Sequence, residues 1–166
     1  HRINRRQRQM CIRDRPYGAK DVVLPVVPMF HVNAWGTPYA APMCGTKLVF
    51  PGAKLDGESL TNLMNQEKVT ISLGVPTIWL LLLNYLRDSG KKIDTVKRLI
   101  IGGSSCPRTL FEGFEDEFGA EVIHAWGMTE MSPLGTVNMP SLGEEPKNKK
   151  EYYDQKLPQG LSLIHI

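Results

Sequence analysis

The sequence predicts an α/β fold in which a mostly parallel sheet is flanked by helices. Short apolar runs alternate with helical stretches along residues 21–136. Alternation at this spacing favours parallel strands joined by crossover helices. The 166 residues, of which 42% are hydrophobic and 22% are charged, have the balance of a globular chain and argue against disorder or a collagen-like repeat. We therefore expect one domain, or part of a larger one.

Five runs are expected to be strands, because they are short and apolar and several are followed by proline or glycine. They are residues 22–30, 47–50, 70–73, 98–101 and 121–126. Pro25 is a local objection within the first run, since proline cannot donate a hydrogen bond to a neighbouring strand.

Helices are expected between these strands. Residues 31–41 could form a helix entered directly from the first strand. Asp56 offers a side-chain oxygen as the N-cap of the next helix, in which Leu60, Leu63 and Met64 fall on one face.

Two further helices and a polar segment complete the pattern. The helix over residues 77–89 follows a proline, ends at Gly90 and is apolar on nearly all sides, so we expect it to be buried. Pro107 and Gly119 bound another helix, and the polar residues beyond Thr136 indicate a surface loop or an exposed helix.

Charge is distributed unevenly along the chain. Residues 1–20 carry six arginines and one lysine against one aspartate, whereas residues 21–166 carry 13 basic and 16 acidic side chains. A basic arm of this kind could bind nucleic acid. We favour instead that residues 1–19 and 161–166 are non-native flanks, because both contain what reads like translated adapter sequence, with a native domain over residues 20–160. We therefore expect no nucleic-acid partner.

The cysteines and apolar runs bear on the compartment. Cys11, Cys44 and Cys106 form no CxxC pair and give an odd count, so we expect neither a disulfide framework nor a zinc site. The longest apolar run, residues 78–83, is too short to span a bilayer. The first twenty residues lack the apolar core of a signal peptide. We expect a reduced, cytoplasmic protein without a transmembrane segment.

Ligands of parallel α/β sheets bind where the strands end. Three segments therefore become candidates: HVNAW after Phe30, GGSSCP after Ile101 and GMTE after Trp126. Gly102 and Gly103 remove side chains where the backbone must turn or approach a flat ligand closely, although an ordinary turn would use them equally well.

Several side chains in these segments could carry chemistry. Thr129 and Glu130 place a hydroxyl beside a carboxylate, which suits phosphate oxygens and Mg²⁺, although Thr-Glu is also a helix-start signal. His31 could contact an anionic reactant or be a structural histidine. Trp35 and Trp126 could line a ligand or belong to the core.

Four segments in this order, PMFHVNAWG, GVPTIW, LIIGGSSCPR and HAWGMTEMSPLG, together resemble consecutive stretches of the adenylate-forming acyl-CoA synthetases. The similarity covers residues 20–160 and points above all to bacterial fatty-acyl-CoA synthetases and methylmercaptopropionate-CoA ligases. It implies that a carboxylate attacks the α-phosphorus of ATP, releasing pyrophosphate, and that the thiol of coenzyme A then captures the acyl-adenylate. The implied reactants are a medium- or long-chain fatty acid, ATP, coenzyme A and the cation Mg²⁺.

The resemblance also implies roles for individual residues. Trp126 takes the place of an aromatic residue that stacks on adenine, Thr129 contacts phosphate oxygens, and Glu130 helps to hold the metal. The implied nucleotide-binding residues are Gly103, Ser104, His124, Ala125, Trp126, Gly127 and Thr129. The implied acyl-binding residues are His31, Val32, Trp35 and Gly103. The implied catalytic residues are His31, Thr129 and Glu130, and Glu130 is the implied metal ligand.

The resemblance is partial. The upstream phosphate-cradling loop, the downstream ribose-binding aspartate and the small C-terminal domain of such enzymes have no counterpart in this sequence. We therefore expect an internal fragment of the large N-terminal domain, without ligase activity of its own, and the full-length parent could be a homodimer.

The sequence is compatible with other functions. A short acid such as 3-methylmercaptopropionate could be the substrate. A nonribosomal adenylation domain or a luciferase-like oxidase is a rival within the superfamily, although His31 and Trp35 favour a linear acyl chain. Rivals of a different class are a non-catalytic nucleotide-binding remnant and a nucleic-acid binder built on the basic arm.

Overall fold

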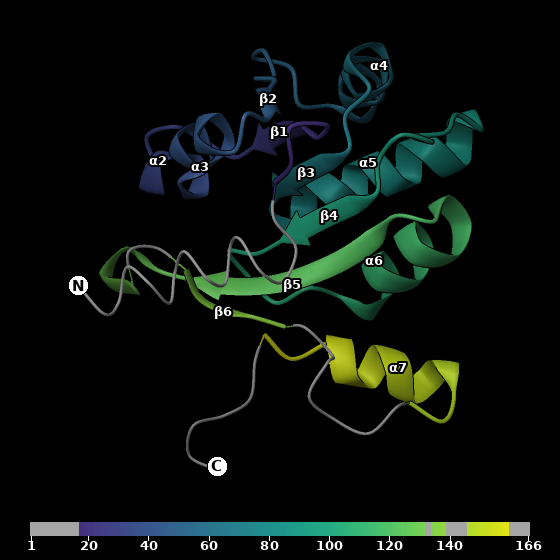
Figure 1. The fold of residues 1–166 in the computed structure, drawn as a ribbon. Coiled ribbons are helices and arrows are strands. Elements are labelled where there is room, and N and C mark those ends of the chain that lie inside the picture. The colour runs from purple at the N-terminus through teal and green to yellow at the C-terminus, as the bar shows by residue number, and fades with distance from the viewer. Residues whose placement is uncertain (1–16, 132–133, 139–145, 160–166) are drawn as a thin grey trace.

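The chain forms a six-stranded sheet in the order β2-β1-β3-β4-β5-β6 in a computed structural model, which describes residues 17–131, 134–138 and 146–159 (Figure 1). Neighbouring strands run parallel from β2 to β5, and β6 is antiparallel to β5. The strands are β1 (Val22–Val26), β2 (Lys47–Leu48), β3 (Ile71–Gly74), β4 (Arg98–Ile101), β5 (Glu121–Gly127) and β6 (Leu134–Val137). The predicted mostly parallel α/β sheet is confirmed.

Helices connect the strands and follow the sheet. They are α2 (Val32–Trp35), α3 (Thr37–Met43), α4 (Gly57–Glu67), α5 (Pro76–Ser89), α6 (Arg108–Glu112), the π-helical turn η1 (Gly113–Glu117), the 3-10 turn η2 (Thr129–Met131) and α7 (Lys149–Lys156). Asp56 caps α4 as predicted, because its carboxylate accepts a hydrogen bond from the backbone N–H of Ser59 at 2.9 Å. Within the described part of the chain, no helix combines the length and the apolar character needed to cross a membrane.

The main core lies between one face of the sheet and helices α4, α5 and α6 with η1. Trp79 of α5 meets Phe114 of η1 edge to face, with ring centroids 6.5 Å apart. Both rings are fully buried, and burial of a large apolar side chain stabilises a fold by about 1.5–3 kcal/mol. A second, smaller cluster, formed by Val23, Ile71 and Leu73, lies on the opposite face.

The expectation that α5 is buried is wrong for half of its surface, because only one face of the helix is buried. Trp79, Leu82, Leu83 and Leu86 face the core, whereas the Leu81 side of the helix is open, with Leu81 itself 57% exposed. The reason is geometric. A helix with 3.6 residues per turn turns only one stripe toward the sheet on which it lies, whatever the composition of the other side.

The segment after β1 also differs from expectation. The predicted single helix over residues 31–41 is broken in two. Residues 32–35, which make up α2, all have φ between +47° and +57°, so α2 is one left-handed turn. Gly36 follows at φ +73°, and the right-handed helix α3 begins only at Thr37. Left-handed backbone costs L-residues with a side chain roughly 1–2 kcal/mol each, so this turn is strained.

The first predicted strand is shorter than expected, and one strand was missed. β1 ends at Val26, two residues before Pro28, whose carbonyl accepts a turn hydrogen bond from His31. Pro25 is accommodated inside β1, where the pairing with β2 has already ended at Val23. The missed strand is β6.

Some predictions fall outside the described residues. The flank predicted over residues 1–19 is described only from residue 17, and the flank over residues 161–166 and Cys11 are not described. Cys44 and Cys106 are both free thiols.

Candidate functional site

The three segments singled out in the sequence follow the carboxyl ends of parallel strands. α2 follows β1, the Gly102–Gly103 turn follows β4, and η2 follows β5. Because β1, β3, β4 and β5 are parallel, these ends share one edge of the sheet. Figure 1 shows α2, α3 and the β5–β6 hairpin at the same end of the sheet.

The segment after β1, predicted to bind the acyl group, and the end of β5, predicted to bind nucleotide, approach each other at Gly102. A Cβ atom placed on Gly102 would lie 3.3 Å from Cη2 of Trp35 and 2.9 Å from the carbonyl oxygen of Ala125. The half-buried indole of Trp35 and the end of β5 therefore approach the same bare stretch of backbone. Only glycine leaves room for both, which explains the first glycine of the pair.

The second glycine of the pair serves the turn itself. Gly103 has φ +85°, a conformation that side-chain-bearing residues rarely adopt, and it is exposed together with Ser104. Cys106, three residues further on, is buried, and burial raises the pKa of its thiol to about 12. The thiol therefore stays protonated near neutral pH, and we assign it to packing instead of chemistry.

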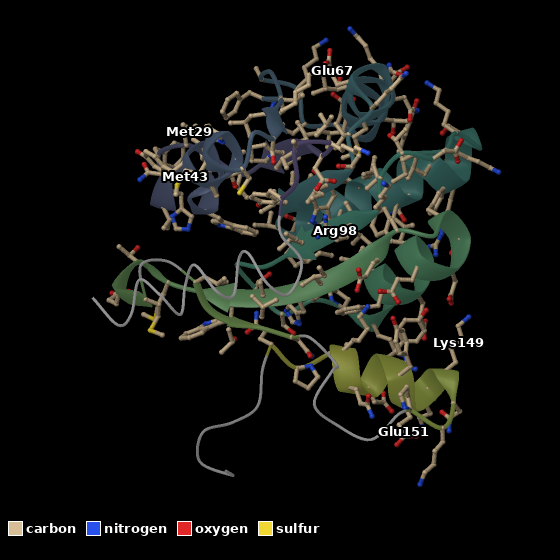
Figure 2. The ribbon with its side chains drawn as sticks, viewed as in Figure 1. Met29, Met43, Glu67, Arg98, Lys149 and Glu151 are labelled. Atoms are coloured by element: carbon tan, nitrogen blue, oxygen red, sulfur yellow. The ribbon has the colours of Figure 1, made fainter. Side chains whose placement is uncertain are left out.

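Around the predicted acyl residues, the surface is unusually apolar. His31 is exposed and Val32 is half-buried. Phe30 is 92% exposed, and Met29 and Met43 are also exposed. Figure 2 shows Met29 and Met43 close to α3. An apolar acyl chain would find suitable contacts on such a surface.

The predicted nucleotide residues lie at the end of β5 and in η2. Trp126 is 37% exposed. Gly127, Thr129 and Glu130 are exposed as well, so their polar groups can reach a ligand in solution. Over the residues that the structure describes, no group of three His, Cys, Asp or Glu side chains could hold a metal ion by itself. A cation at Glu130 would need ligand atoms from elsewhere, such as phosphate oxygens.

His124 is placed differently from its neighbours in the motif. Its ring is buried, meets Phe111 edge to face at 6.1 Å, and has Nδ1 2.7 Å from the carbonyl oxygen of Leu157. Since a carbonyl only accepts, Nδ1 carries the proton and donates. The backbone carbonyl of His124 accepts from the N–H of Asn138 at 2.8 Å. The predicted contact between His124 and nucleotide therefore stays a prediction, and the ring is engaged in holding the segment after α7.

That segment supports the β5–β6 hairpin, a role that sequence reasoning missed. Asn138 donates its amide to the carbonyl oxygens of Gln155 and Pro158 at 2.7 and 2.5 Å. The Thr136 hydroxyl donates to the carbonyl oxygen of Gln159 at 2.6 Å. From sequence, the polar residues beyond Thr136 predicted only a surface loop or an exposed helix. A backbone carbonyl accepts a hydrogen bond whatever its side chain is, so the residue types do not reveal these bonds.

Comparison with known proteins shows the family of the chain. The AMP-binding enzyme family matches residues 3–162. Among curated relatives, 3-methylmercaptopropionyl-CoA ligase of Ruegeria pomeroyi is 48% identical over 152 residues, which are 89% of this chain and 28% of the relative. Medium-chain-fatty-acid–CoA ligase of Ectopseudomonas oleovorans is 57% identical over 122 residues, which are 74% of this chain and 22% of the relative.

A solved structure gives the same result for the fold. The N-terminal domain of FACL13 from Mycobacterium tuberculosis superimposes with a TM-score of 0.66 at 26% identity, covering 76% of this chain and 31% of that one. The predicted placement of this fold in the large N-terminal domain of an adenylate-forming enzyme agrees with that match. The chain spans only about a quarter of the length of the curated relatives that it matches.

Proposed function

Because the chain belongs to the AMP-binding enzyme family, we propose that it is part of an AMP-forming acyl-CoA ligase. The enzyme activates a carboxylic acid as an acyl-adenylate with release of pyrophosphate, and then transfers the acyl group to the thiol of coenzyme A. ATP, the acid and coenzyme A are its small-molecule partners.

One observation carries this proposal beyond the family match. The reaction requires the acid and the α-phosphate of ATP to meet, so acyl and nucleotide segments must adjoin. The approach of Trp35 and of the Ala125 carbonyl to the same bare face of Gly102 supports such a meeting point. In this arrangement, His31, Val32 and Trp35 contact the acyl group near Gly103.

On the nucleotide side, Trp126 stacks on adenine and Thr129 contacts phosphate oxygens. Ser104, Ala125 and Gly127 contribute main-chain surface around the base. Negative charge shifts onto pyrophosphate as it departs, and a bound Mg²⁺ offsets that charge. The residues fit such an ion: Glu130 offers one exposed carboxylate beside the Thr129 hydroxyl, and Mg²⁺ commonly takes one or two carboxylates together with substrate phosphates.

The acid that we propose is a medium- or long-chain fatty acid. The exposed Phe30, Met29 and Met43 beside α3 support an apolar chain. A short sulfur-containing acid is the second candidate, favoured by the 48% identity to the Ruegeria pomeroyi ligase. The two candidates differ mainly in how much apolar surface the acid must cover.

The test is ATP–pyrophosphate exchange by the complete reading frame that contains this chain. Acids of graded length, from 3-methylmercaptopropionate to palmitate, are compared at saturating ATP. We expect exchange that depends on the acid and is fastest with medium or long chains. A maximum at 3-methylmercaptopropionate would select the second candidate, and exchange with amino acids alone would refute the ligase proposal in favour of an adenylation domain.

Glu130→Gln tests the metal role in the same assay. We expect exchange to fall about 10²-fold, the order found when one charge-stabilising group is removed, and the Mg²⁺ concentration for half-maximal rate to rise. Glu58→Gln, an exposed carboxylate on α4, is the matched control and should leave both quantities unchanged. Equal behaviour of the two variants would remove Glu130 from the proposed site.

Three subsidiary proposals accompany the function. The enzyme works in the cytoplasm, as its free Cys44 and Cys106 thiols suggest, and cell fractionation checks this. It forms a homodimer, which analytical ultracentrifugation of the complete protein checks. Residues 1–19 and 161–166 are non-native flanks around a native partial domain over residues 20–160, and sequencing across both junctions in genomic DNA checks this.

A further inference from the structure

We infer that Gly135 is a positioning residue for the nucleotide site, because the Trp126 indole packs directly against it. The inference rests on the proposed function only in taking Trp126 as the surface that stacks on adenine. The position of the indole itself follows from the strand geometry alone.

The β5–β6 hairpin is irregular at this point. Trp126 pairs with Thr136, but the next residue, Gly127, pairs with Leu134, so Gly135 is the extra residue of a bulge on β6. Bulges bend a strand locally and re-aim nearby side chains. Here the re-aimed side chain is that of Trp126, which lies across the bulge.

Glycine is required at position 135 because there is no room for a side chain, and not because of the backbone conformation. The φ of Gly135 is outside the left-handed region, so its backbone could accommodate a side chain. A Cβ atom on Gly135 would nevertheless lie 2.5 Å from Cε3 of Trp126 and closer still to Cζ3. Real Cβ contacts of that length do not occur, so an added methyl group and the observed indole cannot coexist.

The indole should be the part that moves. It is the far end of a side chain that is 37% exposed, whereas the other neighbour of the added atom, Cε of Met131, would be at an ordinary 3.5 Å. An alanine at 135 would therefore swing the ring toward solvent and leave the hairpin folded. Adenine would lose its stacking surface without loss of the protein's stability.

The first measurement needs no ligand. Acrylamide quenching of tryptophan fluorescence in the 166-residue chain reports mainly Trp126, because Trp79 is fully buried and Trp35 is half-buried. We expect Gly135→Ala to raise the quenching constant at an unchanged Tm. Gly52→Ala is the matched control, since a Cβ there meets nothing within 4 Å. A quenching constant equal to that of the control, or a Tm several degrees below it, overturns the inference.

The second measurement is the KM for ATP in pyrophosphate exchange by the complete reading frame. Gly135→Ala should raise this KM about tenfold, the order that a base–aromatic stack contributes, with the KM for the acid unchanged. In a Trp126→Ala background, Gly135→Ala should have no further effect. An unchanged KM for ATP, or an effect that persists without Trp126, overturns the assignment to the nucleotide site. Absence of any exchange by the unmodified protein refutes the proposed function instead, and the quenching result still decides whether Gly135 positions the indole.

Discussion

Lys156 at the end of α7 forms a nearly buried ion pair with Glu115 of η1, and its removal should be costly. Their side chains are only 4% and 11% exposed. The Lys156 ammonium also donates to the Tyr152 hydroxyl at 3.1 Å, and Glu115 accepts from the backbone N–H of Val122 at 2.8 Å. The pair therefore joins α7, η1 and β5.

The expected magnitude follows from what each variant leaves behind. Lys156→Met keeps the apolar stem but strands the Glu115 carboxylate with one remaining donor, and breaking a buried pair in this way costs about 3–5 kcal/mol. Because both groups are slightly exposed, we expect the low end, about 3 kcal/mol. Glu115→Gln strands the ammonium and should cost a similar amount. The double variant leaves neither charge unpaired and should lose only about 1 kcal/mol.

Urea denaturation of the 166-residue chain, followed by far-ultraviolet circular dichroism at pH 7, measures these differences. A loss of 3 kcal/mol corresponds to a midpoint shift of roughly 1–2 M at an m-value of about 2 kcal/mol/M. The matched control is the exposed pair Lys47–Glu67, 2.6 Å apart with side chains 56% and 28% exposed, where the same substitutions should cost under about 1 kcal/mol. Additive losses in the double variant, or equal effects at the two pairs, would refute the argument.

Three smaller predictions follow from charge, backbone and burial. The hydrogen bond from Lys149 lowers the pKa of Asp116, so Asp116 stabilises the fold above about pH 4, and that stabilisation is lost as pH falls through the lowered value. Asp116→Asn should therefore lower Tm slightly at pH 7 and flatten its dependence on pH in the acid range. Asn33 has φ +50°, so Asn33→Val should cost about 1 kcal/mol in urea denaturation, whereas Asn33→Gly should cost nothing. Burial raises the pKa of the Cys106 thiol to about 12, so iodoacetamide at pH 8 should alkylate Cys44 before Cys106, as mass spectrometry would reveal, and guanidinium should abolish the difference.

Most strands of the sheet could be predicted because each is a short apolar run that local composition reveals. The run Arg98–Ile101 matches β4 at both ends, and Glu121–Gly127 differs from its prediction by one residue. β6 was missed because Leu134–Val137 is short, contains a glycine and becomes a strand only by pairing with β5. A sequence pattern indicates which face of a segment is apolar. It does not show whether another strand lies beside that segment to pair with it.

The candidate site, too, could be predicted from the sequence only in part. The segments that follow β1, β4 and β5 could be located from strand order alone, and the glycine pair was predicted to serve either a close approach or an ordinary turn. Nothing in the residue types indicated that Val32 and its neighbours would turn left-handed, because such a turn is imposed by surrounding contacts against local preference. The contact of Trp35 with Gly102 depends on that turn, so it too could be found only in three dimensions.

The hydrogen bonds that hold the β5–β6 hairpin predict that some positions tolerate substitution better than others. Side chains of Thr136 and Asn138 donate to main-chain oxygens of residues 155, 158 and 159, which every amino acid supplies. A saturation library across both segments should therefore accept many replacements at 158 but few at 136 and 138. Growth selection on such a library would show which residues donate these hydrogen bonds through their side chains and which accept them through the backbone.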